Sequence, residues 1–134
     1  MTDENKSANI QEELARAASA LRAASLLAEN NLLNDAVSRL YYFLLYHVRA
    51  LLLTVGLEAR SHETAPRLFG LHFVRKGIFG RDSSHLFSVL MKYREEADYN
   101  PFYSFTQQDF QELKGQVVNL ASKIKTWIRE QGYL

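Results

Sequence analysis

The sequence predicts an all-α protein, a four- to five-helix antiparallel up-and-down bundle, from the pattern of its 134 residues. Apolar residues recur every three or four positions over long stretches, which places them on one face of a helix. The alternation of apolar and polar residues that marks a half-buried strand is missing. A chain of this length buries roughly two thirds of its unfolded surface in a single core. We therefore expect one domain over residues 1–134, with residues 1–8 flexible.

Two long helices are expected in the first half of the chain. The first covers about Ile10–Glu29, where apolar positions at helical spacing are flanked by charged side chains. The second covers Leu33–Val55 and ends at Gly56, a residue that suits the left-handed conformation past a helix end. The second helix carries large side chains on its flank as well as on its apolar face. We expect it to be the centre of the bundle.

Three further helices are expected in the second half. A short helix over 66–74 has its proline in the first turn, where proline is tolerated. A fourth helix is expected to be capped by Asp82 or Ser83 and to end near Asn100, because Pro101 disfavours helical geometry in the residue before it. The fifth, over 107–128, follows a capping box made by a threonine and an aspartate three residues later.

The overall charge of +1 is too balanced for a protein that coats nucleic acid through charge alone. Any contact with nucleic acid must therefore be local. The absence of cysteine excludes disulfides and thiol chemistry. The most apolar stretch, 40–57, is interrupted by charge and predicts a buried helix, so neither a membrane span nor a secretory signal is expected. We expect a cytoplasmic protein.

Three segments resemble the HEPN family of helical proteins. The stretch AVSRLYYFLLYHVRALL, residues 36–52, resembles the signature helix of small prokaryotic members, S-R-x-Y-Y-x-x-x-[HY] followed by a basic residue and A-L-L. Residues 68–77 resemble the connecting helix, and REEADY, residues 94–99, resembles the R-x-x-A-D-Y element. The resemblance implies a four- or five-helix bundle that dimerises and binds nucleotides or RNA. It also implies a partner, a minimal nucleotidyltransferase encoded beside it as a two-component system.

Ribonucleases of this family carry an arginine followed four to six residues later by a histidine near a helix end. The matching positions here are Arg94 and Tyr99. An unperturbed tyrosine titrates near about 10, too high to exchange a proton with a ribose hydroxyl at neutral pH. The departure from the motif predicts little or no ribonuclease activity. If activity exists, Arg94 and another base such as His47 or His62 are the candidates.

A second set of residues points to binding. Arg39 lies one turn from Tyr42 and two turns from Tyr46, so a cation is placed among aromatic faces that can stack a base or hold a phosphate. Alternatively, Arg39 pairs with Asp98 inside the bundle while the tyrosines fill the core. Arg94 and Asp98, one turn apart, can also form a surface ion pair. The candidate binding residues are Arg39, Tyr42, Tyr46, Arg94, Asp98 and Tyr99.

The histidines favour structural roles. His47 falls near the apolar face of its helix, which predicts a buried, hydrogen-bonded imidazole rather than a catalyst. His62, His72 and His85 lack the helical spacing of metal ligands, so no metal is expected. Phosphate-loop, dinucleotide and hydrolase motifs are also missing, so no cofactor is expected.

These observations predict a non-catalytic HEPN-like protein that binds nucleotide or RNA, or a nucleotidyltransferase, in a toxin–antitoxin-like pair. The alternatives are a metal-independent ribonuclease toxin and a purely structural homo-oligomeric bundle. Large side chains in excess of what one small core absorbs indicate a homodimer. They are Phe102, Tyr103, Phe105, Trp127 and Tyr133.

Overall fold

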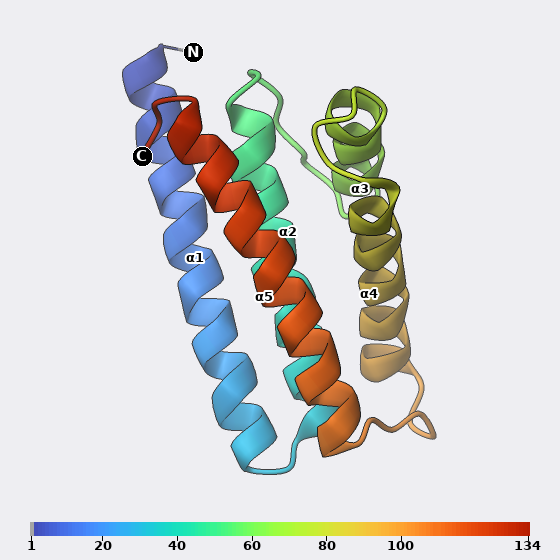
Figure 1. Ribbon diagram of the computed structural model, residues 1–134. Coiled ribbons are helices and arrows are strands. Elements are labelled where there is room, and N and C mark those ends of the chain that lie inside the picture. The colour runs from blue at the N-terminus through green and yellow to red at the C-terminus, as the bar shows by residue number, and fades with distance from the viewer. Residues whose placement is uncertain (1) are drawn as a thin grey trace.

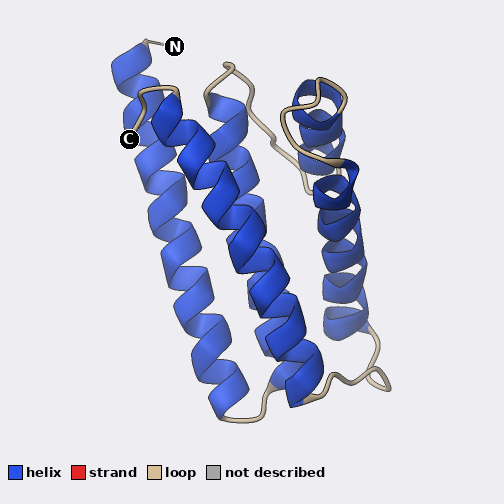
Figure 2. Ribbon diagram, in the orientation of Figure 1, coloured by secondary structure: helices blue, strands red, loops and turns tan. Residues whose placement is uncertain are grey.

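The computed structural model describes residues 2–134, and over that range its regular secondary structure is all helical, with no strand (Figures 1 and 2). The predicted fold class is confirmed. Successive long helices run in opposite directions (Figure 1). The elements are α1 (Asp3–Glu29), α2 (Leu33–Leu53), α3 (Thr64–Phe69), the π-helical turn η1 (Gly70–Val74), α4 (Arg81–Tyr99) and α5 (Gln107–Glu130). No described helix is long and apolar enough to cross a membrane.

Helix α2 is the centre of the bundle, as the sequence predicts. It packs against α1, α3, α4 and α5. From residue 36 to residue 53 every position of α2 is buried except 39, 42, 46 and 49. Since these four positions recur at intervals of three and four residues, they form one stripe along the helix. Every other side of α2 is covered by a neighbouring helix.

Helix α1 begins seven residues earlier than its apolar periodicity predicts. The side chain of Thr2 caps it and accepts a hydrogen bond from the Asn5 amide at 3.1 Å. The negative charges of Asp3 and Glu4 in the first turn interact favourably with the positive end of the helix dipole. Most of the segment expected to be flexible is thus helical, and its first residue, Met1, lies outside the described residues. Alanines dominate the buried face of α1 and allow a close approach to α2.

The remaining helix ends agree with the sequence in part. Gly56 follows α2 with φ of 76°, as predicted. Asn100 is extended before proline and ends α4, also as predicted. The predicted side-chain cap of α4 is wrong: the N-cap is Gly80, two residues before Asp82, and it has no capping side chain. At α5 both hydrogen bonds of the capping box between Thr106 and Asp109 are present.

Aromatic side chains fill the core between α2, α3 and α4. The rings of Phe69 and Phe79 lie 5.7 Å apart, and Trp127 of α5 meets Phe73 edge-on at 5.2 Å. Phe105 is buried as well. The core therefore absorbs more of the large side chains than the sequence suggested. Phe102 stays outside, with 94% of its surface exposed.

Candidate functional site

The partly exposed stripe of α2 consists of Arg39, Tyr42, Tyr46 and Arg49, and we call it the arginine–tyrosine stripe. The guanidinium carbon of Arg39 lies 4.7 Å from the centre of the Tyr42 ring, within the range of a cation–π contact. The rings of Tyr42 and Tyr46 follow at 6.3 Å. The stripe thus has a cation at each end and two aromatic rings between them. The sequence predicted three of its four members, and the structure brings them together.

A second group, the Tyr41–His62–Arg94 cluster, adjoins the stripe. The hydroxyl of Tyr41 lies 2.9 Å from Nδ1 of His62, and the guanidinium carbon of Arg94 lies 5.3 Å from the centre of the Tyr41 ring. The three residues come from α2, the α2–α3 connection and α4. The His62 ring also lies 5.8 Å from the Tyr42 ring. This contact joins the cluster to the arginine–tyrosine stripe.

Arg94 is the residue of the cluster whose burial most reduces the stability of the fold. It is 8% exposed, so the expectation of a surface ion pair is wrong, although its Nη1 does lie 3.4 Å from Oδ2 of Asp98. Asp98 is engaged there by Arg94, while Arg39 stacks on Tyr42. The Nε of Arg94 is buried and has no hydrogen-bond partner within residues 2–134. Leaving such a donor unpaired costs about 1–3 kcal/mol, and more for a charged group.

The electrostatics of the cluster set the charge of its two hydrogen-bonded rings. Burial raises the pKa of Tyr41 to about 12, although the charge of Arg94 opposes the shift. Burial also lowers the pKa of His62, and the positive charges of Arg94 and Arg49 add to that effect. At neutral pH both rings are therefore uncharged. The hydrogen bond can then run in either direction: the Tyr41 hydroxyl donates to Nδ1 of His62 and the imidazole proton is on Nε2, or Nδ1 carries the proton and donates to the hydroxyl oxygen.

Of the other predicted residues, His47 lies away from the cluster and Tyr99 lies next to Arg94. His47 is buried, and its Nδ1 donates to the carbonyl oxygen of Phe43 at 2.9 Å. Burial lowers its pKa, and the nearby charge of Lys125 shows that it faces α5. A buried, hydrogen-bonded histidine is what the sequence predicted. Tyr99 is 76% exposed and lines a shallow depression at the end of α4, beside Arg94.

Three residues of this region were not predicted as part of a site: Tyr41, Arg49 and Glu13. Arg49 is ten residues after Arg39, so helical spacing could have placed it on the stripe. Glu13 of α1 is buried and lies 3.2 Å from Arg49. Burial raises the pKa of Glu13, and the charges of Arg49 and Arg16 oppose the shift. No local signal in the sequence joins Tyr41 or Glu13 to these partners.

The family assignment follows from comparison with known proteins. The model of the HEPN domain matches residues 10–131. The chain belongs to the HEPN family. Its signature helix is α2, and the R-x-x-A-D-Y element of this HEPN protein is the last part of α4. The two elements meet where Arg94 stacks on Tyr41.

Three relatives of this HEPN protein come from Thermotoga maritima and Methanocaldococcus jannaschii. A UPF0332 protein from Thermotoga maritima is 31% identical over 120 residues, which cover 89% of this chain and 80% of the relative. A protein named as a candidate toxin from Methanocaldococcus jannaschii is 38% identical over 79 residues, 59% of each chain. A second protein with such a name from the same organism is 30% identical over 94 residues, 66% of this chain and 64% of the relative.

Proposed function

We propose that this HEPN protein is a non-catalytic binding component of a toxin–antitoxin-like pair, and that it binds nucleotide or RNA. The arginine–tyrosine stripe and the adjoining Tyr41–His62–Arg94 cluster are the proposed site. The observation that carries the proposal is the unbroken series of contacts from Arg39 through Tyr42, His62 and Tyr41 to Arg94. The names of the two M. jannaschii relatives support the toxin-related setting.

The composition of the stripe suits a nucleic acid strand. Guanidinium groups bind phosphates through two parallel hydrogen bonds, and tyrosine rings stack on bases of any sequence. Arg39 and Arg49 are ten residues apart, which is about 15 Å along a helix. This distance exceeds the length of one base, so the stripe favours a dinucleotide or a longer single strand over a mononucleotide.

Arg94 supports binding rather than a purely structural role. A buried guanidinium with an unpaired Nε costs stability that an apolar side chain of similar size would not. Residues that weaken the fold in this way are expected where function requires them. Arg94 is also beside the depression lined by Glu95, Glu96, Tyr99 and Asn100, where a strand that leaves the stripe can continue.

The arrangement of His62 favours binding over cleavage. A general base must present a free lone pair to the ribose hydroxyl. We propose that the Tyr41 hydroxyl donates to the Nδ1 lone pair of His62 and that Nε2 carries the imidazole proton. His62 then offers a hydrogen-bond donor to a phosphate or a base, and it has no free lone pair to take a proton.

A ribonuclease is the second candidate, because the structure brings His62 within hydrogen-bond distance of the tyrosine that stacks on Arg94. If Nδ1 of His62 donates to Tyr41 instead, its Nε2 lone pair is free to act as a base. The assay is metal-free incubation of the protein with labelled single-stranded RNA. We expect no cleavage. Robust cleavage by the wild type that is lost in both Arg94→Ala and His62→Asn would establish the ribonuclease and refute the non-catalytic proposal.

Binding is tested by fluorescence anisotropy with a labelled single-stranded RNA and with a labelled adenosine nucleotide. We expect Arg39→Ala and Tyr42→Leu to weaken RNA binding about tenfold each, since a stacked base or a charged contact contributes roughly 1–3 kcal/mol. Arg39→Ala should also reduce the salt dependence of binding by about one phosphate contact. The matched control is Arg22→Ala, at an exposed position of α1. Equal losses in the control and the stripe variants would contradict the site.

The proposed assembly is a homodimer that pairs with a minimal nucleotidyltransferase. Exposed aromatic side chains support association, and Phe102 and Tyr99 at the end of α4 are 94% and 76% exposed. Light scattering at micromolar concentration tests the dimer, and a monomer mass would contradict it. Co-purification with a nucleotidyltransferase encoded beside this protein tests the pairing.

A further inference from the structure

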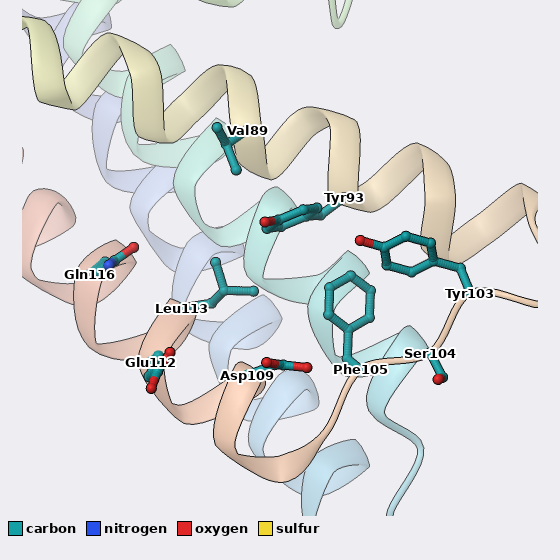
Figure 3. Close-up of a pocket in the computed structure, with 9 residues that line it drawn as sticks. All are labelled: Val89, Tyr93, Tyr103, Ser104, Phe105, Asp109, Glu112, Leu113 and Gln116. Atoms are coloured by element: carbon teal, nitrogen blue, oxygen red, sulfur yellow. The ribbon is translucent and has the colours of Figure 1, made fainter.

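A pocket between α4 and α5 lies apart from the arginine–tyrosine stripe (Figure 3). Its lining comes from α4, from the α4–α5 connection and from α5. Figure 3 shows three aromatic rings at one end and the acidic and amide side chains of α5 along the other wall. The lining residues are Val89, Tyr93, Tyr103, Ser104, Phe105, Asp109, Glu112, Leu113 and Gln116. None of the proposed nucleotide-binding residues is among them.

The three rings form a partial aromatic cage. The ring of Phe105 lies 5.4 Å from that of Tyr93 at an angle of 73°, and 5.1 Å from that of Tyr103 at 55°. Phe105 is buried, whereas both tyrosines are partly exposed. Within residues 2–134 neither tyrosine hydroxyl makes a hydrogen bond. Both hydroxyl oxygens are therefore available as acceptors for a donor that enters the cage.

The charge of the pocket has one sign. Asp109 and Glu112 are the charged lining residues, and none of the nine is basic. Each carboxylate accepts a hydrogen bond from a neutral donor: Asp109 from the Thr106 amide at 2.9 Å, and Glu112 from the side chain of Gln108 at 3.3 Å. Neither is in an ion pair within the described chain. No ion pair in residues 2–134 therefore neutralises the negative charge beside the rings.

The cage is held in shape before any ligand binds. The carbonyl oxygen of Tyr103 accepts from Nδ2 of Asn34 at 2.6 Å, which ties the connection to α2. The capping box of α5 begins at Thr106, directly after Phe105. Such preorganisation lowers the entropic cost of binding. The pocket holds about 280 Å³, slightly below the range of about 300–1,000 Å³ that is usual for drug-sized ligands.

We infer that this pocket is a binding site for an alkylammonium cation, either a small organic amine or the ammonium group of a lysine on a partner protein. Aromatic faces attract cations through the negative charge of their π systems, and cages of this kind select ammonium groups, methylated ones above all. The two carboxylates add a long-range attraction of the matching sign. An anion is repelled by the same charges, so the pocket is not a second nucleotide site.

The first experiment titrates the full chain with two probes and monitors binding by the NMR signals of the Tyr93 and Tyr103 rings. The probes are choline and its uncharged isostere 3,3-dimethylbutan-1-ol. We expect choline to bind about thirtyfold more tightly, because a desolvated cation–π contact contributes about 2 kcal/mol. Equal shifts with both probes would overturn the inference. So would the absence of any shift with choline up to about 50 mM, a concentration that as a Kd corresponds to a binding free energy of only roughly 2 kcal/mol.

Variants locate the site. Tyr103→Leu and Glu112→Gln should each weaken choline binding several-fold, and Phe105→Leu should weaken it further. The matched controls are Phe102→Leu, which changes an exposed ring on the same connection, and Glu4→Gln, which removes an exposed charge on α1. Circular dichroism checks the fold. If Phe105→Leu unfolds, the Tyr103 and Glu112 variants still test whether choline binds in this pocket. Unchanged choline binding in both variants would refute the site.

A final comparison separates the two sources of the cation. Spermidine represents small amines, and an acetylated, amidated lysine with its trimethylated form represents a protein side chain. Tighter binding of spermidine assigns the pocket to a small amine, and tighter binding of the lysine derivatives assigns it to a partner. Failure of all three to bind would refute both. None of these results bears on RNA binding at the stripe.

Discussion

The hydroxyl oxygen of Tyr41 lies 2.9 Å from Nδ1 of His62, and this contact joins the buried side of α2 to the connection that follows it. The high pKa of Tyr41 keeps the hydroxyl protonated at every physiological pH. The direction of the hydrogen bond then decides whether His62 can act as a base. That direction can be measured.

The variant Tyr41→Phe is expected to raise the pKa of His62. Donation to Nδ1 stabilises the neutral imidazole, so its loss moves the pKa up toward the ordinary value of about 6.5. The unfolding free energy should fall by about 1 kcal/mol, the net contribution of one hydrogen bond. NMR titration of the His62 ring, assigned with His62→Asn, measures the pKa, and Tyr133→Phe is the control. A fall in the pKa would mean that Nδ1 donates, and would revive the ribonuclease.

The variant Arg94→Met should weaken RNA binding without weakening the fold. Methionine fills much of the same volume and removes the buried Nε that has no partner, which relieves about 1–3 kcal/mol. The lost cation–π contact with Tyr41 offsets about 1 kcal/mol of this gain. We therefore expect an unfolding free energy in urea equal to that of the wild type or up to about 2 kcal/mol higher. Arg94→Ala, which leaves a cavity, is the comparison and should be less stable. A loss of more than about 2 kcal/mol in Arg94→Met would assign the arginine a structural role.

His47 should make the fold less stable in acid. Burial lowers its pKa in the folded state, so between that value and about 6.5 the unfolded chain binds a proton that the folded chain does not. Stability therefore decreases as the pH falls through this interval. His47→Leu lacks the effect, so the wild type should lose more stability than the variant between pH 7.5 and 5.5 in parallel urea titrations. Contributions of His62 and Glu13 are common to both proteins. Parallel pH profiles would contradict the prediction.

Removing the cap of α5 with Thr106→Ala should cost about 1 kcal/mol of unfolding free energy. The threonine side chain accepts from the Asp109 amide at 3.0 Å, and this hydrogen bond is lost. Thr126→Ala is the matched control, because residue 126 is exposed on the same helix and lies far from the cap. There alanine should be neutral or slightly stabilising, as the better helix former. Thermal unfolding of the two variants measures the difference, and equal melting temperatures would show that the capping box contributes nothing.

Much of the fold could be predicted because each long helix carries an apolar stripe and several ends carry a specific residue. Pro101, Gly56 and Thr106 mark ends that the structure confirms. The start of α1 could not be predicted from periodicity, because its first turns are polar and depend on a cap. The π-helical turn at Gly70–Val74 also has no periodic signature, since a change of hydrogen-bond register depends on how the segment packs.

The candidate site could be predicted only where it follows a single helix. Arg39, Tyr42 and Tyr46 share a face through their spacing alone. The contact of Tyr41 with His62 crosses from α2 into a connection, and the contact with Arg94 crosses to α4, so both depend on how the bundle packs. The sequence also predicted Arg94 on the surface. The spacing between Arg94 and Asp98 predicts their ion pair but not the packing of other elements over Arg94.

The burial of α2 on every side but one has a consequence for how this protein tolerates mutation. Between residues 36 and 53, a substitution at a buried position disturbs the packing of a neighbouring helix, whatever else it does. Positions 39, 42 and 46 are exempt, since their side chains are partly exposed. Position 49 is not exempt, because Arg49 pairs with the buried carboxylate of Glu13 at 3.2 Å. In a saturation library, we therefore expect loss of folding and loss of the proposed RNA binding to fall on different positions of one helix. Variants at positions 39, 42 and 46 can be explored widely, because they form the part of α2 that can change while the bundle stays intact.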